Sequence, residues 1–546
     1  MAADSPTIDR DMRSPIRGQF RTDPDARHVY AEGAGIARII PFAVAEPIDA
    51  EDVVALLRWA AEEHQSLIPR GSGSSMPGGA VGSGIIVDLS RFTELGDVNV
   101  AAQSITAGAG VTRRRIEHSA NAVGLRFPVD PSSGAFATIG GMASTNAAGA
   151  RTLAFGATRR WIRALDCVFA DGSRETVRRG APINSMGPTL ARWNEAAANV
   201  RQRAQRVATH AVRKESSGYG VRDFAESGEL IDLLVGSEGT LALFTSVELS
   251  LAPMPRQTAS ILAAWKSLDA SVVGAALARD HHAAACELLD RTFLDVAAAG
   301  GALPIPEGSE AVLLVEIEDD VDAAARARAL AQAFESAGAT SVQLGLDAES
   351  EESLWALRHA ASPILSRLDP HLKSMQLVED GCVPPARLGD YVRGVREALQ
   401  LQRLRGVIFG HAGDAHVHVN ALIDVREIDW RERARRFCEA VVELTATLGG
   451  TLAGEHGDGR LRTPWLDRVW EPSALALFAD IKEIFDPRRI LNPGVKVATD
   501  GADILAANKY DPSLAPLSRR AREVLDRVER ERAYDSSRLE LLKGVG

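Results

Sequence analysis

Two segments rich in glycine and small hydroxyl residues constrain the fold of this chain more than any other feature. The first runs from Arg70 to Ser75, with Gly78 and Gly79 behind it, and the second runs from Thr138 to Asn146. Glycine lets a backbone approach a ligand closely, and successive free N–H groups attract anions, so both segments suit the pyrophosphate of a nucleotide cofactor. Taken singly, such clusters are more often plain turns. The first reads G-x-G-x-x-M, and G-x-x-x-x-G-K-[ST] does not occur, so we expect neither a Rossmann fingerprint nor a P-loop.

The totals of the chain narrow its class. A length of 546 residues exceeds what one hydrophobic core usually supports, so we expect two or three domains. The net charge of -11 argues against a nucleic-acid binder, although a local basic pocket for a small anion remains compatible with it. The N-terminus lacks a secretory apolar core, and no uncharged apolar run is long enough to span a bilayer. We therefore expect a cytoplasmic protein, and leave peripheral contact with the inner face of the membrane open.

The cysteine pattern argues against an internal electron relay. The 4 cysteines lie far apart in the sequence and form no C-x-x-C pair. An iron–sulfur cluster or a thiolate zinc site is therefore not expected, and buried reduced thiols are the simplest interpretation.

Histidines gather near the end of a predicted strand. Of the 12 histidines, three (His411, His416 and His418) fall within eight residues, and Gly454-Glu455-His456-Gly457 follows about 35 residues later. A strand from Ala415 to Leu422 would place His416, His418 and Asn420 on one face, and the turn before it would let His411 fold back. Two imidazoles and a carboxylate make an open zinc-type site. A metal there would polarise a substrate hydroxyl, and His456 could take its proton as general base.

Together and in this order, these pieces resemble the flavin-binding domain of vanillyl-alcohol-oxidase-type flavoproteins. More closely, the chain resembles the D-lactate, glycolate and D-2-hydroxyglutarate dehydrogenase branch of the FAD-linked oxidases. The matching pieces span about residues 40 to 496 and read PRGSGSS, DPSSGAFATIGGMASTNAAGA, FGATRRWIRALDCVFADG, KESSGYGV, VGSEGTLALFT, GHAGDAHVHVN, GEHGDG and DPRRILNPGVK. A metal-dependent hydrolase could use the same histidines but would leave both glycine segments without a role.

The resemblance, with the strand and helix pattern, implies an α+β fold in five parts. Residues 1–40 form an N-terminal arm, and 41–255 form an FAD-binding domain of two subdomains. Residues 256–455 form an α+β substrate or cap domain with a large antiparallel sheet. Residues 456–500 return to the flavin, and 501–546 form a charged helical tail. That tail is most simply a solvated helix, with docking of an electron-accepting partner as the alternative.

The resemblance also implies which residues hold FAD. The first loop wraps the pyrophosphate, the second lines the flavin and its phosphates, Glu238 and Gly239 lie near the adenine and ribose end, and Asn492 returns toward the flavin. Relatives with covalent FAD carry histidine at the position of Ser74, and serine cannot make that bond, so non-covalent FAD is predicted. The expected cofactor residues are Arg70, Gly71, Ser72, Gly73, Ser74, Ser75, Pro131, Ser132, Thr138, Gly140, Gly141, Ser144, Thr145, Asn146, Glu238, Gly239 and Asn492.

The family's metal ligands match His411, His418 and Glu455, which would hold Zn²⁺ or another divalent ion. His456 matches the base, and Asn420 matches a substrate contact. His416 departs from the pattern, because many relatives have asparagine there. It could be an extra ligand, a second acid or base, or a packing change, and the sequence leaves these three open.

Arg358 matches the arginine whose planar fork binds the substrate carboxylate, and Ser362, one helical turn on, could assist it. The D-2-hydroxyglutarate enzymes add a lysine just before the segment that Asp380 to Pro384 resembles. Val378 stands there instead, and Lys373 lies earlier, so D-lactate or another monocarboxylate is favoured.

We therefore expect an FAD-dependent dehydrogenase that oxidises a D-2-hydroxy acid to the 2-oxo acid by hydride transfer to the flavin. Without an internal relay, the electrons should pass to a cytochrome, a quinone, an electron-transfer flavoprotein or a separate iron–sulfur subunit. D-2-hydroxyglutarate or glycolate dehydrogenase activity is the alternative within the branch, and a metal-dependent hydrolase is the alternative outside it. A non-catalytic flavin subunit is a third, although such relatives tend to lose the histidine motifs. The oligomeric state is open, with a homodimer as one option.

Overall fold

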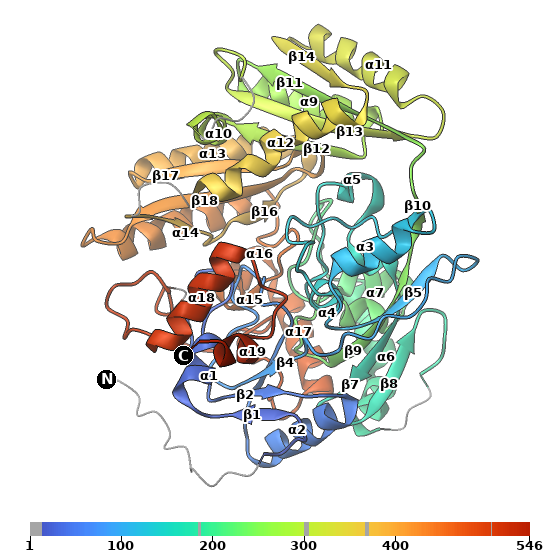
Figure 1. The fold of residues 1–546 in the computed structure, drawn as a ribbon, viewed down its shortest axis with the longest axis vertical. Coiled ribbons are helices and arrows are strands. Elements are labelled where there is room, and N and C mark those ends of the chain that lie inside the picture. Colours follow the sequence, from blue (N-terminus) through green and yellow to red (C-terminus); the bar gives the residue numbers. More distant parts are fainter. Residues whose placement is uncertain (1–13, 184–186, 300–304, 366–370, 504, 546) are drawn as a thin grey trace.

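The computed structural model describes residues 14–183, 187–299, 305–365, 371–503 and 505–545 (Figure 1). The strands form several separate sheets, with a large antiparallel sheet at the top of the view and smaller sheets below it, and helices pack around them. The expected α+β class is confirmed. The predicted bounds of the two main domains, 41–255 and 256–455, remain predictions.

A 4-stranded sheet carries the first glycine segment. Its order is β1 (Gln19–Arg21), β2 (Ala43–Glu46), β4 (Ile85–Asp88) and β3 (Leu67–Arg70), and β2, β4 and β3 run parallel. The helix α2 (Ala50–Glu62) begins at Asp49, whose side chain accepts from Asp52 N, and it buries Val53, Leu56 and Leu57 against this sheet. The glycine segment starts where the parallel strand β3 ends, as in other α/β ligand sites.

A second 4-stranded sheet is antiparallel, in the order β5 (Ser104–Gly108), β9 (Leu243–Ser250), β7 (Ile162–Val168) and β8 (Arg174–Arg178). The hairpin β7–β8 turns at Asp171-Gly172, where the φ of +78° at Gly172 suits glycine. The core of this region also contains residues of α17 (Pro472–Phe485), which packs on α6 (Pro188–Ala204). The remaining elements here are α3 (Arg113–Asn121), β6 (Leu125–Arg126), α4 (Ile139–Thr145), α5 (Thr152–Phe155), η1 (Thr158–Trp161), α7 (Val221–Ser227), α8 (Ile231–Leu234), β10 (Ala252–Pro253), α15 (Gly459–Arg462), η4 (Thr463–Trp465) and α16 (Leu466–Val469).

The large antiparallel sheet has 8 strands, and β16 (Asp380–Cys382) pairs with β18 beside the main order. That order is β14 (Ser341–Gly345), β11 (Gln257–Trp265), β13 (Ala311–Asp319), β12 (Ala285–Asp290), β17 (Arg405–His411), β18 (His416–Asp424) and β15 (Leu372–Met375). Alternate residues of each strand face opposite sides. One side packs on α9 (Leu268–Asp280), α11 (Ala323–Ser336), α13 (Leu388–Leu401) and α14 (Trp430–Thr447), and the other on α10 (Arg291–Ala299) and α12 (Ala348–Leu365). The short helix η2 (Pro385–Arg387) precedes α13.

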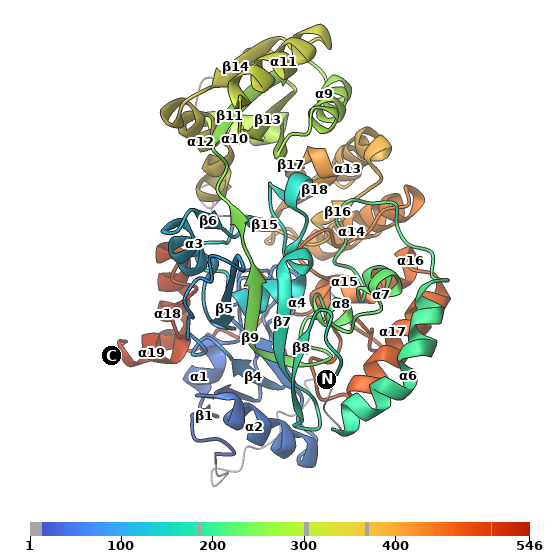
Figure 2. The ribbon, with the colours of Figure 1, turned by 90° about the vertical axis from the view of Figure 1, so that its right-hand side faces the viewer.

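The C-terminal tail is a packed part of the fold. Its helices α18 (Arg519–Glu531) and α19 (Arg538–Lys543) lie beside α1 (Pro24–Val29), as both views show (Figures 1 and 2). Val524 and Val528 of α18 are buried against Val44 and Ile86 of the first sheet. The expectation of a solvated helix is therefore wrong for one face of α18, because that face carries apolar side chains at helical spacing.

In the described ranges, no helix is long and apolar enough to cross a membrane. All four cysteines are free and buried, as the sequence indicated.

Candidate active site

A cavity of about 1220 Å³ lies between the two glycine segments and the large sheet. Its lining includes most of the predicted cofactor residues: Arg70, Gly71, Ser72, Gly73, Ser74, Ser75, Pro131, Ser132, Thr138, Gly140, Gly141, Ser144, Thr145 and Glu238. On the sheet side it is lined by Arg358, His411, His418, Asn420, Glu455 and His456. The structure therefore brings the two halves of the predicted site to one cavity.

Three predicted cofactor residues lie behind this lining. Asn146 ends α4 at a φ of +51°, and its side-chain oxygen accepts from Arg159 N at 2.9 Å. Gly239, at a φ of +70°, sits against Pro69. Asn492 donates through Nδ2 to the carbonyl oxygens of Gly79 and Glu238, at 3.0 and 2.8 Å. Their contacts hold the loops in place, and direct contact with FAD stays a prediction for all three.

The β17–β18 hairpin gathers the histidines. His411 ends β17, the short helix η3 (Ala412–Asp414) follows, and His411 pairs with His416 at the start of β18. Alternation along β18 then places His418 and Asn420 on the same side as His416. Four residues separate the strands: the three of η3 and Ala415, whose φ of +54° lets the chain reverse. The predicted strand and the predicted turn are both confirmed.

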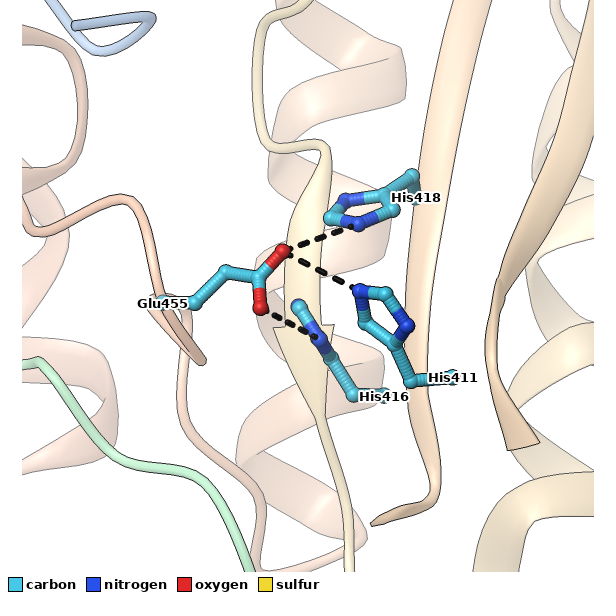
Figure 3. A group of neighbouring side chains, drawn as sticks. All are labelled: His411, His416, His418 and Glu455. Carbon is cyan, nitrogen blue, oxygen red and sulfur yellow. Dashed lines mark hydrogen bonds and ion pairs between the residues drawn. The ribbon is translucent and has the colours of Figure 1, made fainter. Parts of the chain in front are cut away.

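Glu455 completes the group from a different segment. Residues 451–454, which follow α14, run beside β16, where Gly454 N donates to Asp380 O at 2.9 Å. The carboxylate of Glu455 therefore enters the cluster, with Oε1 at 3.2 Å from His411 Nε2 and 3.3 Å from His418 Nε2 (Figure 3). The ligand atoms offered by His411, His416, His418 and Glu455 all lie within 4.8 Å of one another. The three predicted metal ligands are thus brought together, and binding of a metal stays a proposal.

Three buried carboxylates that the sequence did not single out for this role surround the imidazoles. Glu287 of β12 contacts His411 Nδ1 at 2.5 Å, and Glu379 contacts His418 Nδ1 at 3.2 Å. Asp380 of β16 contacts His416 Nε2 at 2.7 Å. Carboxylates only accept hydrogen bonds when ionised, so they fix which imidazole nitrogen carries the proton.

Two buried cations balance these acids. Lys214 Nζ donates to Glu455 Oε2 at 2.8 Å, and Arg462 donates to Glu379 Oε1 and to Asp380 Oδ2 at 2.5 and 3.0 Å. Burial raises the pKa of Glu455, but Lys214 and His411 outweigh burial and hold it well below its ordinary value. Burial likewise opposes ionisation of Asp380, yet the positive charges around it lower its pKa to about 2. The acids of the site are therefore ionised at neutral pH.

His456 lies at the edge of the cluster and reaches the cavity. Its ring stacks on His418 with centroids 5.1 Å apart, and its Nδ1 contacts Glu379 Oε1 at 2.8 Å. Its side chain is 29% exposed, whereas those of the other three histidines are 8% exposed or less. Burial lowers the pKa of His456, but Asp380 and Glu379 raise it to about 9. A divalent cation beside it would oppose that rise, because like charges disfavour the imidazolium.

Arg358 of α12 also lines the cavity, and it contacts the carboxylate oxygen of Glu287 that His411 does not contact. Its Nε donates to Glu287 Oε2 at 2.8 Å, and its guanidinium lies 4.9 Å from the centroid of the Phe409 ring. Glu287 therefore links the predicted carboxylate-binding arginine to His411. The side chain of Ser362 lies outside the described residues. Val378 is buried, and Lys373 places its ammonium 5.7 Å from the Tyr510 ring, away from the lining of the cavity.

Comparison with known proteins identifies the family. The FAD binding domain family matches residues 41–178, and the C-terminal domain of the FAD linked oxidases matches residues 254–495. The D-lactate dehydrogenase of Archaeoglobus fulgidus is 31% identical over 457 residues, which cover 83% of this chain and 90% of that protein. The chain belongs to the FAD-linked oxidase family.

Other relatives of this FAD-linked oxidase differ in the substrates that their names imply. The glycolate oxidase subunit GlcD of Bacillus subtilis is 28% identical, over 86% of this chain and 92% of that protein. The D-2-hydroxyglutarate dehydrogenase of Escherichia coli is also 28% identical, but this chain spans only 51% of its length. A solved alkyldihydroxyacetonephosphate synthase shares the fold, with a TM-score of 0.58 at 14% identity over 87% of this chain and 82% of that one.

The glycine loops fit the FAD of this family. A Cβ on Gly71 would lie 2.1 Å from Thr138 Oγ1, so glycine at this position lets the two loops meet. A Cβ on Gly140 would lie 2.6 Å from Ala109 Cβ, so glycine there lets the second loop pack against the turn after β5. Within the described part of the chain, the buried hydroxyl of Ser75 has no hydrogen-bond partner. It lines the cavity and is available to a phosphate oxygen. The protein is thus an FAD-dependent oxidoreductase, and a hydrolase, which would leave both loops without a role, is set aside.

Proposed function

We propose that this FAD-linked oxidase dehydrogenates a D-2-hydroxy acid, with D-lactate or a similar monocarboxylate as substrate, and passes the electrons to an external acceptor. The observation that carries the proposal is the lining of one cavity. It combines the FAD loops with an arginine, Arg358, an imidazole, His456, and a His–Glu cluster. An anion, a hydroxyl group and a hydride acceptor can therefore meet there.

The roles of the residues follow from their contacts. Arg358 pairs with the substrate carboxylate, and its contacts with Glu287 and Phe409 fix the plane of its fork. The neutral form of His456, which a bound divalent cation favours, takes the hydroxyl proton at Nε2, since Glu379 holds Nδ1. Asn420, two residues after His418, contacts the substrate from β18. When bound, FAD supplies the hydride acceptor.

A divalent ion fits the cluster of His411, His418 and Glu455. Three outer carboxylates orient the imidazoles, and one buried imidazole nitrogen, His416 Nδ1, has no hydrogen-bond partner in the described structure. Such an ion would act as a Lewis acid toward the substrate hydroxyl. His411, His418 and Glu455 would hold it, whether it is Zn²⁺ or another divalent metal.

The substrate preference rests on the resemblance to the family. Val378, which is buried, matches the position of the lysine in the D-2-hydroxyglutarate enzymes, and Lys373 lies over Tyr510, outside the lining of the cavity. Turnover should be measured with an artificial electron acceptor on D-lactate, L-lactate, glycolate and D-2-hydroxyglutarate. We expect the highest kcat/KM for D-lactate. A clear preference for D-2-hydroxyglutarate would move the protein to the dicarboxylate alternative.

Replacing Arg358 with methionine should raise KM for the hydroxy acid about 10- to 100-fold, since a charge-assisted hydrogen bond contributes roughly 1.5–3 kcal/mol. Arg358→Lys keeps the positive charge but loses the planar guanidinium, so its KM should lie between those of the wild type and Arg358→Met. Steady-state kinetics measure both. Arg328→Met, on the exposed face of α11, is the matched control. An unchanged KM in Arg358→Met would remove this residue from the carboxylate site.

The flavin should be dissociable, because Ser74 offers a hydroxyl where covalent attachment needs an imidazole. Acid or heat precipitation of the holoenzyme is therefore expected to leave the yellow colour in the supernatant. A yellow pellet, with the flavin mass retained on a peptide, would show a covalent bond elsewhere.

The electrons should leave the flavin for an external acceptor, because the four cysteines are buried and too far apart in the sequence to suggest an internal iron–sulfur relay. That acceptor is a cytochrome, a quinone, an electron-transfer flavoprotein or a separate iron–sulfur subunit.

A further inference from the structure

We propose that His416 is a fourth protein ligand of the divalent ion, binding through Nδ1 beside His411, His418 and Glu455. The inference rests on the metal site of the proposed function and concerns a residue for which the sequence left three roles open. In Figure 3 all three rings point toward the Glu455 carboxylate, and His416 approaches its second oxygen.

The first observation is a shared pattern of outer carboxylates. His411 and His418 each contact a carboxylate through Nδ1 and face Glu455 through Nε2. His416 shows the same arrangement with its nitrogens exchanged, since Nε2 contacts Asp380 and Nδ1 faces Glu455. A carboxylate that accepts the N–H of an imidazole leaves the lone pair on the opposite nitrogen, which is how metal-binding histidines are usually oriented. By this criterion His416 is as well prepared as the two predicted ligands.

The second observation is an unsatisfied atom. The side chain of His416 is fully buried, and Nδ1 has no hydrogen-bond partner among the described residues. A buried polar atom without a partner destabilises the fold. The nearest acidic atom, Glu455 Oε2, lies 4.0 Å away, beyond hydrogen-bond range. A divalent ion among the three imidazoles would give this lone pair a partner.

The other two roles fit less well. A second acid or base must reach the substrate, yet His416 is fully buried and does not belong to the lining of the cavity. If His416 were only a packing change, its ring would not need a glycine beside it. A Cβ on Gly454 would lie 2.7 Å from the His416 ring, so the ring occupies space that only glycine leaves free, directly before Glu455.

Two neighbouring groups decide where the ion lies. Glu379, Asp380, His418 and His456 form a second acidic cluster, but Arg462 already neutralises both of its carboxylates. Lys214 donates to Glu455 Oε2 at 2.8 Å, which leaves Oε1, between His411 and His418, as the less occupied oxygen. The ion therefore belongs among the three imidazoles. Four protein ligands fill a tetrahedron, so a substrate oxygen would need a fifth position, and metals that accept five or six ligands are favoured.

The test counts the coordinating imidazoles in the holoenzyme after its metal is replaced by Co²⁺. Proton NMR of the paramagnetic protein should show three exchangeable, strongly shifted imidazole N–H signals. Two come from Nδ1–H of His411 and His418, and one comes from Nε2–H of His416. His416→Asn should show two signals and bind Co²⁺ more weakly in competition with a chelator, by more than the roughly 10- to 100-fold that loss of an outer-shell partner typically causes.

His118→Asn, an exposed histidine of α3, should retain three signals and wild-type affinity. Two signals in the wild-type protein, or unchanged Co²⁺ affinity in His416→Asn, would overturn the proposal. If His416→Asn does not fold with its full flavin content, the signal count of the wild-type protein decides alone. Protein that binds no Co²⁺ but still reduces its flavin with a hydroxy acid would reject the metal site and leave the dehydrogenase proposal standing.

Discussion

His456→Ala should lower kcat for the D-2-hydroxy acid by about 10²–10⁴-fold, the usual contribution of a positioned general base. The expected change in KM is small, because Arg358 and Asn420 still line the cavity and hold the substrate. The flavin content should stay at the wild-type level, since His456 contacts Glu379 and His418 rather than the glycine loops.

Rapid mixing under anaerobic conditions is the direct measurement, because it isolates the rate of flavin reduction from electron transfer to the acceptor. His118→Ala, exposed on α3, is the matched control and should reduce its flavin at the wild-type rate. Near wild-type reduction in His456→Ala would show that another group takes the proton. It would also reopen the assignment of the whole cluster.

Arg462→Met should destabilise the protein by about 3–5 kcal/mol, the range for removing one partner of a buried ion pair. Arg462 is fully buried and donates to Glu379, to Asp380 and to the carbonyl oxygen of Gly457. Methionine fills a similar volume but leaves two buried carboxylates without their cation. Denaturant unfolding, monitored by circular dichroism, measures the loss of stability as a lower midpoint concentration of denaturant.

The control is an exposed arginine in a surface pair. Arg436 contacts Glu432 one turn away on α14, and both side chains are more than half exposed, so Arg436→Met should change stability by about 0–1 kcal/mol.

The stability that Arg462 contributes should depend on pH in a definite direction. The folded-state pKa values of Glu379 and Asp380 are lowered, so their stabilisation is present above their ordinary pKa and is lost as the pH falls through the folded values. The difference between Arg462→Met and wild type should therefore narrow in acid, and a constant difference would place the effect of Arg462 elsewhere.

The core of the site was predictable because it depends on local rules. Strand alternation placed His416, His418 and Asn420 on one side, and a turn returned His411 to them. The positions of the outer carboxylates depend instead on the order of the strands in the sheet, which no local pattern gives. Glu287 lies 124 residues before His411, and only the pairing of β12 with β17 makes them neighbours. One signal was present, since Glu287 interrupts the apolar run of a buried strand.

The C-terminal tail shows a different limit. Its abundant charges suggested a solvated helix, yet Ala521, Val524, Leu525 and Val528 recur at helical spacing and are buried. The apolar stripe was visible in the sequence, but its partner, the first parallel sheet, was not. Tyr534 and Arg532 follow this helix and line the cofactor cavity, a placement that no local pattern indicates.

A D-2-hydroxy acid should deliver hydride to the bound flavin in this cavity. The decisive measurement is to mix the purified holoenzyme anaerobically with D-lactate, and separately with L-lactate, while recording the visible flavin band. We expect D-lactate to bleach the band and L-lactate to leave it unchanged, with the bleaching slowed by a chelator. Protein that purifies without flavin, or a flavin that no D-2-hydroxy acid reduces, would contradict this activity.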